Sequence, residues 1–230
     1  LHLMSTTKKI GTLMSVIARG DFRQVRARWR YHSRLMRLSR HHEPFVYDCG
    51  RDRLVCDPKL SDSASAFIEL PSDLGERQFF HGWLRPGDVV VDAGANVGLF
   101  TAVAAQCVGQ SGCVYSIEPT PRLVEHLRLS ARKLAAAKVE VMSAALAGSP
   151  GRAKFAFAAP GTTLVSQSLA SSNGVPSGTS ELKEVELITL PMIAAHLGAG
   201  VMPALVKLDV EGVEAEVLRS APRAWMEADG

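Results

Sequence analysis

The sequence predicts an α/β fold with a doubly wound, mainly parallel sheet. From Val89 onward, short apolar runs typical of strands buried on both faces alternate with segments of helical periodicity. A glycine-containing turn joins the first of these runs to a helix, as in folds that bind ligands at the ends of their strands. With 47% hydrophobic and 21% charged residues, the 230-residue chain has the composition of a globular protein with one sizeable core.

The expected parallel strands cover residues 89–91, 113–117, 139–142 and 204–208, and the expected helices cover 97–107, 121–137, 191–197 and 214–220.

Segments 155–157 and 185–190 are expected to form an inserted antiparallel pair, separated by a Ser/Gly-rich loop at 161–180. Strand 204–208 is expected at a sheet edge, where its backbone groups would lack a partner. Since a doubly wound sheet usually continues past this point, we expect the chain to be truncated at its C-terminus.

Residues 1–43 are expected to form a basic helical N-terminal arm. Residues 1–42 contain ten Lys and Arg against one acid, Asp21, whereas the remaining chain has 16 basic and 22 acidic residues. Such an arm suits peripheral contact with an anionic membrane or a protein partner. The alternative is a solvated arm packed on the domain, and no strong signal for nucleic-acid binding is present.

Two further regions follow this arm. Residues 44–87 are expected to hold a β-hairpin or lid and an entry helix at 74–84, and residues 88–230 the ligand-binding domain. No apolar run reaches the ~20 residues that a membrane-spanning helix requires. The four cysteines lack the spacing of zinc ligands, so we expect no metal, and a reducing cytoplasm fits best.

The strongest motif is Asp92-Ala-Gly94-Ala-Asn96-Val-Gly98, which directly follows the strand at 89–91. Gly94 allows a tight turn and a close approach of backbone amides to a ligand, and Gly98 allows the next helix to pack on the sheet. The dinucleotide pattern G-x-G-x-x-G fails, because Asn96 replaces its second glycine. We expect Asp92 to favour a ligand with a cationic end.

The second motif is Glu118, which ends the next apolar strand about twenty residues after the glycine turn. An acid at this place accepts hydrogen bonds from ribose hydroxyls. The alternative is an N-cap or first-turn acid on the helix that follows Pro119.

The third motif places Lys207, Asp209 and Glu211 at alternating positions at a strand end, so that their side chains can share one side. The two carboxylates can bind an ammonium group, deprotonate a hydroxyl or hold a divalent cation. Alternatively, Glu211 and Glu214 only favour a helix N-terminus. Lys207 is expected to pair with a strand-end acid.

Together these motifs, with Ser143-Ala-Ala-Leu146, resemble the FkbM family of S-adenosylmethionine (SAM) methyltransferases over roughly residues 45–221. The resemblance implies a class I methyltransferase fold, SAM as cofactor and an acceptor hydroxyl on a sugar, glycan or natural product. Carried over by position, the SAM-binding residues are Asp92, Gly94, Asn96, Gly98, Glu118, Ala145 and Asp209. Asp209 and Glu211 are the implied catalytic residues.

The sequence departs from this family where Thr189-Leu190-Pro191 replaces the common Thr-Leu-Asp. His81 and His196 are alternative bases. Two other classes of protein stay open: a non-catalytic or truncated nucleoside-binding module and, against the failed glycine pattern, an NAD-dependent oxidoreductase.

Overall fold

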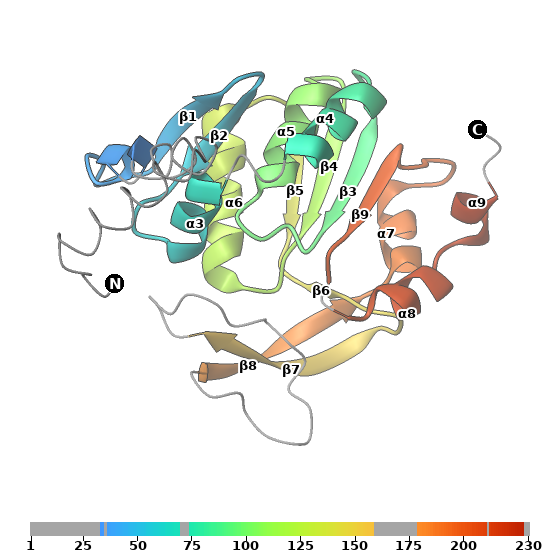
Figure 1. Ribbon diagram of the computed structural model, residues 1–230. Coiled ribbons are helices and arrows are strands. Elements are labelled where there is room, and N and C mark those ends of the chain that lie inside the picture. Colours follow the sequence, from blue (N-terminus) through green and yellow to red (C-terminus); the bar gives the residue numbers. More distant parts are fainter. Residues whose placement is uncertain (1–32, 35, 70–73, 159–178, 211, 228–230) are drawn as a thin grey trace, which may run out of the picture.

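Four parallel strands form the central sheet of the computed structural model, which describes residues 33–34, 36–69, 74–158, 179–210 and 212–227 (Figure 1). The strand order is β5-β4-β3-β9. The strands are β3 (Val89–Ala93), β4 (Cys113–Ile117), β5 (Lys138–Met142) and β9 (Leu205–Leu208). The predicted doubly wound arrangement is confirmed, and β9 lies at the edge of this sheet as expected.

Helices cover both faces of the sheet, which explains the continuous apolar runs of β3 and β4. On one face, α4 (Leu74–Trp83) and α5 (Leu99–Val108) contribute to a core cluster with Val90 and Val114. On the other face, α7 (Leu190–Leu197) and α8 (Glu214–Arg219) contribute to a cluster with Val91 and Ile117. The remaining helices of this domain are α6 (Pro121–Leu134) and α9 (Arg223–Met226).

The predicted N-terminal hairpin forms a further layer outside α5 and α6 (Figure 1). It consists of antiparallel β1 (Phe45–Cys49) and β2 (Asp52–Cys56), followed by α3 (Ser61–Glu69). Leu54 and Phe67 pack against Ala102 of α5. The short alanine side chain allows this close approach, so α5 is buried between the sheet and the hairpin.

A buried ion pair ties the hairpin to α4. Asp52 on β2 accepts a hydrogen bond from Arg77 at 2.7 Å and lies 2.6 Å from Nε2 of His81. Asp52 and Arg77 are both almost fully buried, and Cys107 of α5 lies 3.3 Å from the other ring nitrogen of His81. The hairpin is therefore anchored to the domain by charge as well as by apolar contacts.

The inserted antiparallel pair belongs to a separate three-stranded sheet, in the order β6-β8-β7. The strands are β6 (Ala145–Leu146), β7 (Gly151–Ala158) and β8 (Thr179–Ile188), and β6 pairs with β8 in parallel. Strand β7 is longer than expected at both ends, whereas β8 begins before residue 185 and ends at Ile188, short of the expected 190. Apart from its last two residues, which begin β8, the predicted loop at 161–180 lies outside the described residues.

Several boundaries differ from the sequence predictions for local reasons. Helix α5 begins at Leu99 because Gly98 has the left-handed φ of 82°. Helix α6 ends at Leu134 because Ala135 has φ 45°. The sequence predictions also missed α3, β6 and α9, which are short or poor in the residues that set a clear apolar period.

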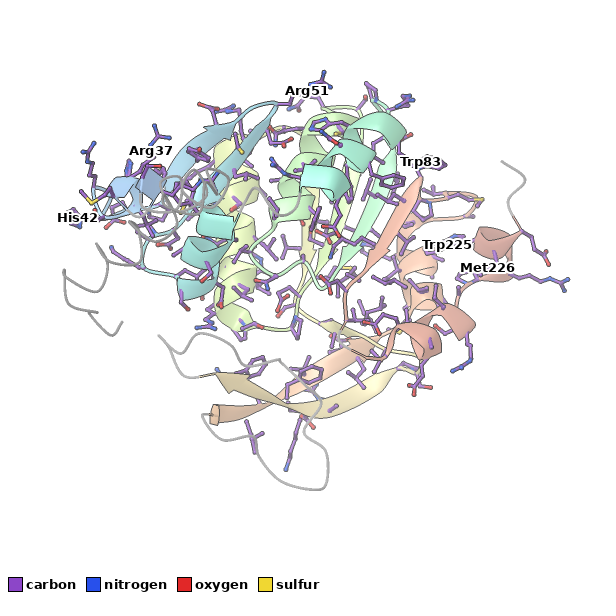
Figure 2. All side chains as sticks on the ribbon, viewed as in Figure 1. Arg37, His42, Arg51, Trp83, Trp225 and Met226 are labelled. Atoms are coloured by element: carbon purple, nitrogen blue, oxygen red, sulfur yellow. The ribbon has the colours of Figure 1, made fainter. Side chains whose placement is uncertain are left out.

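The predicted basic arm at 1–43 lies mostly outside the described residues. Residues 33–34 and 36–38 are helical. Figure 2 shows Arg37 and His42 near the start of β1 and Arg51 at the β1–β2 turn, on the side of the molecule opposite β7 and β8. The proposed contact of this arm with an anionic membrane or a protein partner stays a prediction. Among the described residues, no helix combines the length and apolar character that a membrane span needs.

Gly98→Ala is expected to destabilise the protein because position 98 lies at the contact between α5 and α6. An added Cβ would lie 2.5 Å from Cδ2 of Leu127. We expect the left-handed backbone to cost about 1–2 kcal/mol and the overpacking about 1–3 kcal/mol more, measured as the free energy of unfolding in urea.

Gly200→Ala is the control. Gly200 has φ 79°, close to the 82° of Gly98, but a Cβ there would meet no atom within 4 Å, so only the backbone cost applies. An equal loss of stability in both variants would show that Leu127 moves aside without cost.

Candidate functional site

A pocket of about 320 Å³ opens at the carboxyl ends of the parallel strands. After β5 the chain returns to form β9 on the opposite side of β3, which makes a topological switch point beside β3. Ligands of open α/β sheets bind at such points, and the volume lies within the roughly 300–1,000 Å³ of small-molecule sites. The polar end is lined by Gly94, Asn96, Glu118 and Asp209, and the apolar end mainly by Ile117, Pro119, Ala145, Leu146, Phe155 and Leu187.

The turn after β3 is fixed by its own backbone amides. The N–H groups of Gly94 and Ala95 both donate to the carbonyl of Ile117 at 3.0 Å. The Asn96 N–H donates to Glu118 Oε2 at 2.9 Å. These three amides therefore hold the turn against β4, instead of pointing at a ligand as the sequence suggested.

Gly94 is required because the backbone after β9 passes directly over it. A Cβ at this position would lie 1.9 Å from the carbonyl oxygen of Asp209. In addition, the Asp209 N–H donates to the carbonyl of Ala93 at 3.1 Å. The loops after β3 and β9 are thus in direct contact at the polar end of the pocket.

Glu118 lies at the pocket wall and is only 3% exposed. Its Oε1 accepts a hydrogen bond from the Thr120 N–H at 2.9 Å, and its Oε2 accepts the one from Asn96. Each carboxylate oxygen can accept further bonds. Glu118 is not the N-cap of α6, which is Thr120, but it accepts the N–H of that residue. It also lines the pocket, and its role as the acid that binds ribose stays a prediction.

Burial raises the pKa of Glu118, against the lowering effect of its bonds from Thr120 and Asn96. A carboxyl whose folded-state pKa is raised binds protons more readily when folded than when unfolded. Its contribution to the free energy of unfolding therefore falls as the pH rises from 4.5 through the raised value. This burial costs stability at neutral pH, which marks Glu118 as a candidate for function.

Asp92 is fully buried below the turn and does not line the pocket. Its Oδ2 accepts a 2.6 Å hydrogen bond from the Thr101 hydroxyl, and its Oδ1 lies 3.6 Å from Nζ of Lys207. In the sheet register Asp92 lies between Ser116 and Lys207. The carboxylate thus already has a cationic neighbour from β9, unlike the expectation that it meets the cationic end of a ligand.

Lys207 lies between two carboxylates, that of the buried Asp92 and that of the exposed Asp209. Its Nζ also lies 3.2 Å from Oδ2 of Asp209, whose side chain is 68% exposed, and 5.1 Å from the centre of the Phe100 ring. The expectation that Lys207 pairs with a strand-end acid is confirmed. Asp209 is consequently held at the pocket rim by an ammonium group on its own strand.

The structure brings together five of the seven predicted cofactor-binding residues. Gly94, Asn96, Glu118, Ala145 and Asp209 line the pocket, whereas Asp92 and Gly98 lie behind it. The helix that follows Gly98 packs on the sheet as expected, and Gly98 itself lies against Leu127 of α6.

Among the predicted catalytic residues, Asp209 lines the pocket and Glu211 lies outside the described residues. Glu214 accepts hydrogen bonds from the Gly212 and Val210 amides just before α8, in agreement with its interpretation as an acid at a helix N-terminus. Neither alternative base lines the pocket. Nε2 of His81 lies 2.6 Å from Oδ1 of Asp52, and Nε2 of His196 lies 2.5 Å from Oε1 of Glu140. Among the described residues, no group of three or more His, Cys, Asp or Glu side chains could hold a metal.

Apart from Ala145 of β6, the sequence predictions missed the contribution of the second sheet to the pocket. Phe155 of β7 and Leu187 of β8 also line its apolar end. Segments 155–157 and 185–190 were expected only as an antiparallel pair, and the pairing of β8 with β6, which brings them to the pocket, is a long-range property.

Comparison with known proteins adds a family match. The model of the methyltransferase FkbM domain matches residues 92–228, which include the turn after β3, β9 and the loop after it. Protein-L-isoaspartate O-methyltransferase 2 of Archaeoglobus fulgidus is 44% identical over 59 residues, 26% of this chain and 27% of that protein. The match thus spans about a quarter of the length of this curated relative.

Solved structures of methyltransferases are similar over parts of the chain. A SAM-dependent methyltransferase from Aquifex aeolicus is 28% identical with a TM-score of 0.29, covering 32% of this chain and 42% of that one. A protein-L-isoaspartate O-methyltransferase is 23% identical with a TM-score of 0.28, covering 44% of this chain and 28% of that one.

Lys207→Met is expected to leave the Asp92 carboxylate without its cationic neighbour. Removing one partner of a buried pair costs up to about 3–5 kcal/mol, measured as the free energy of unfolding in urea. The double variant Asp92→Asn/Lys207→Met should regain part of that loss, because neither charge then remains.

Lys138→Met provides the control on β5, at the opposite edge of the sheet from β9. Lys138 lies 3.8 Å from Glu140 with 68% of its side chain exposed, and such surface pairs contribute about 0–1 kcal/mol. A loss for Lys207→Met no larger than for Lys138→Met would contradict the role of Lys207 as the counter-charge of Asp92.

Proposed function

Because the chain belongs to the FkbM methyltransferase family, we propose that it transfers a methyl group from SAM to a hydroxyl group of a sugar, glycan or natural product. The observation that carries this proposal is a pocket with a buried acid, Glu118, between an apolar end and a polar end. It lies at the carboxyl ends of β3, β4 and β9, where α/β sheets bind nucleosides.

Family membership also confirms the expected class I methyltransferase fold. The family model covers β4, β5, β9 and the last two residues of β3, the strands that form the parallel sheet. The nicotinamide alternative gains no support, since the turn after β3 keeps its amides on Ile117 and Glu118 and has no dinucleotide glycine pattern.

The residues of the pocket fit SAM in three places. The free acceptor positions of Glu118 suit two ribose hydroxyls, and the apolar end around Ala145 suits a purine. The exposed carboxylate of Asp209 suits the ammonium of the methionine part or the acceptor hydroxyl. The buried Asp92 supports this end indirectly, by holding Lys207.

When bound, SAM supplies a methyl group activated by its sulfonium. The protein must then align an acceptor oxygen and remove its proton. Asp209 is the described pocket carboxylate with a largely exposed side chain, and Nζ of Lys207 lies 3.2 Å from its Oδ2. We assign Asp209 as the base that accepts the proton of the acceptor hydroxyl, with Glu211 as the alternative.

The choice of a hydroxyl acceptor is supported by the base that the site offers. An alcohol must lose a proton to become a strong nucleophile, and Asp209 lies at the pocket rim, where an acceptor can approach from solvent. A non-catalytic nucleoside-binding module is the second interpretation, which cofactor binding without methyl transfer would favour.

Glu118→Gln should weaken binding of S-adenosylhomocysteine, measured by calorimetric titration. The amide keeps one acceptor oxygen where the carboxylate has two, and hydrogen bonds to charged groups contribute about 1.5–3 kcal/mol. We expect about a 10- to 100-fold loss of affinity. Glu125→Gln, an exposed residue of α6, is the control and should bind like the wild type. No binding by folded wild-type protein would refute the proposed function.

The pH dependence of the same titration gives a second readout. The carboxylate accepts hydroxyl protons only while ionised, and burial raises the pKa of Glu118. Wild-type affinity should therefore fall as the pH is lowered through a value above 4.5, and Glu118→Gln should show a flatter profile. Parallel profiles for the two proteins would count against the role of Glu118.

Asp209→Asn should leave S-adenosylhomocysteine affinity within a few-fold but lower methyl transfer by about 10²- to 10⁴-fold, the usual contribution of a general base. The assay follows S-adenosylhomocysteine release with a panel of sugar, glycan and phenolic hydroxyl acceptors. Glu211→Gln is measured in parallel. If only Glu211→Gln abolished transfer, the base would be Glu211.

A further inference from the structure

All three strands of the second sheet contribute to the apolar end of the pocket. Ala145 and Leu146 come from β6, Leu187 from β8 and Phe155 from β7. In the register Ala145 pairs with Leu187, and β8 pairs with β7 on its other side. The inserted hairpin is therefore part of the pocket wall.

Phe155 is the aromatic residue of this wall. Its side chain is 7% exposed and lies among Ala145, Val185 and Phe157. The rings of Phe155 and Phe157 are stacked, with centroids 6.4 Å apart and planes 24° from parallel. Two residues apart on one strand, they share a face of β7, but only Phe155 lines the pocket. Phe157 thus supports the Phe155 ring from behind.

Two backbone N–H groups near this end of the pocket are already occupied. The Glu118 N–H donates to Met142 at 3.1 Å, and the Ala147 N–H donates to Ile188 at 2.8 Å. The side chains that line it are aliphatic, apart from Phe155. Such a surface favours a flat, apolar group that binds by stacking and shape.

We propose that Phe155 is a specificity-determining residue of the cofactor site, whose ring forms one face of the subsite for the purine base. This inference rests on the proposed function, since it requires that a SAM-type nucleoside occupies the pocket with its ribose at Glu118. The purine then lies against β6 and β7, at the apolar end of the pocket. The insertion of β7 and β8 thereby becomes part of nucleoside recognition.

The test compares Phe155→Ala with Phe157→Ala by calorimetric titration of S-adenosylhomocysteine and of adenosine. The two variants remove the same buried ring from the same strand, and only one of them changes the pocket wall. Loss of base–aromatic stacking should lower the affinity of Phe155→Ala for both ligands by about 5- to 150-fold. Phe157→Ala should bind within about threefold of the wild type.

Phe155→Tyr and Phe155→Leu separate stacking from simple filling of space. Phe155→Tyr keeps the aromatic face, so its ligand affinity should be within a few-fold of the wild type. The affinity of Phe155→Leu should lie between those of the wild type and Phe155→Ala. Circular dichroism and urea unfolding of each variant identify any sample that is not folded.

The outcomes separate this inference from the proposed function. Absence of binding in folded wild-type protein would overturn the proposed function itself. Wild-type binding with unchanged affinity in Phe155→Ala would overturn only the purine subsite, and the apolar end would then be available to the methyl acceptor. An equal loss in Phe155→Ala and Phe157→Ala would also overturn it, because the effect would then come from the stability of the second sheet.

Discussion

The site depends on the contact between two backbones at Gly94. The carbonyl of Asp209 occupies the space that any Cβ on residue 94 would need. The hydrogen bond from the Asp209 N–H to the Ala93 carbonyl fixes the same two loops. A side chain at position 94 would separate β9 from β3 at their carboxyl ends. Such a displacement would move Asp209 and Lys207 together, and with them the polar end of the pocket.

Charges are arranged at two depths around this contact. Asp92, Thr101 and Lys207 form a buried group below the turn, and Glu118 and Asp209 face the pocket above it. Lys207 connects the two depths, because its ammonium lies close to both aspartates. Glu118 has a comparable double role, since the carboxylate that faces the pocket also holds the start of α6.

The sequence predicted the parallel strands and the polar end of the pocket because these depend on local signals: apolar runs, one glycine turn and acids at strand ends. Asp92 was assigned to the ligand, since nothing local shows that Lys207 lies beside it in the sheet register. Phe155 was missed for the same reason, because its place in the pocket depends on strand pairings across a long loop. Helix α3 lacked a clear apolar period.

The polar end of the pocket comes from the parallel sheet, whereas most of the apolar end comes from the second sheet, which the chain enters through the short strand β6. The turn after β3 and the loop after β9 can therefore keep the polar end unchanged while β7 and β8 vary. For protein engineering, this separation makes the two ends independent design variables. Under the proposed function, a larger apolar end would admit cofactor analogues with extra groups on the purine, and the surroundings of the proposed base, Asp209, would not need to be rebuilt.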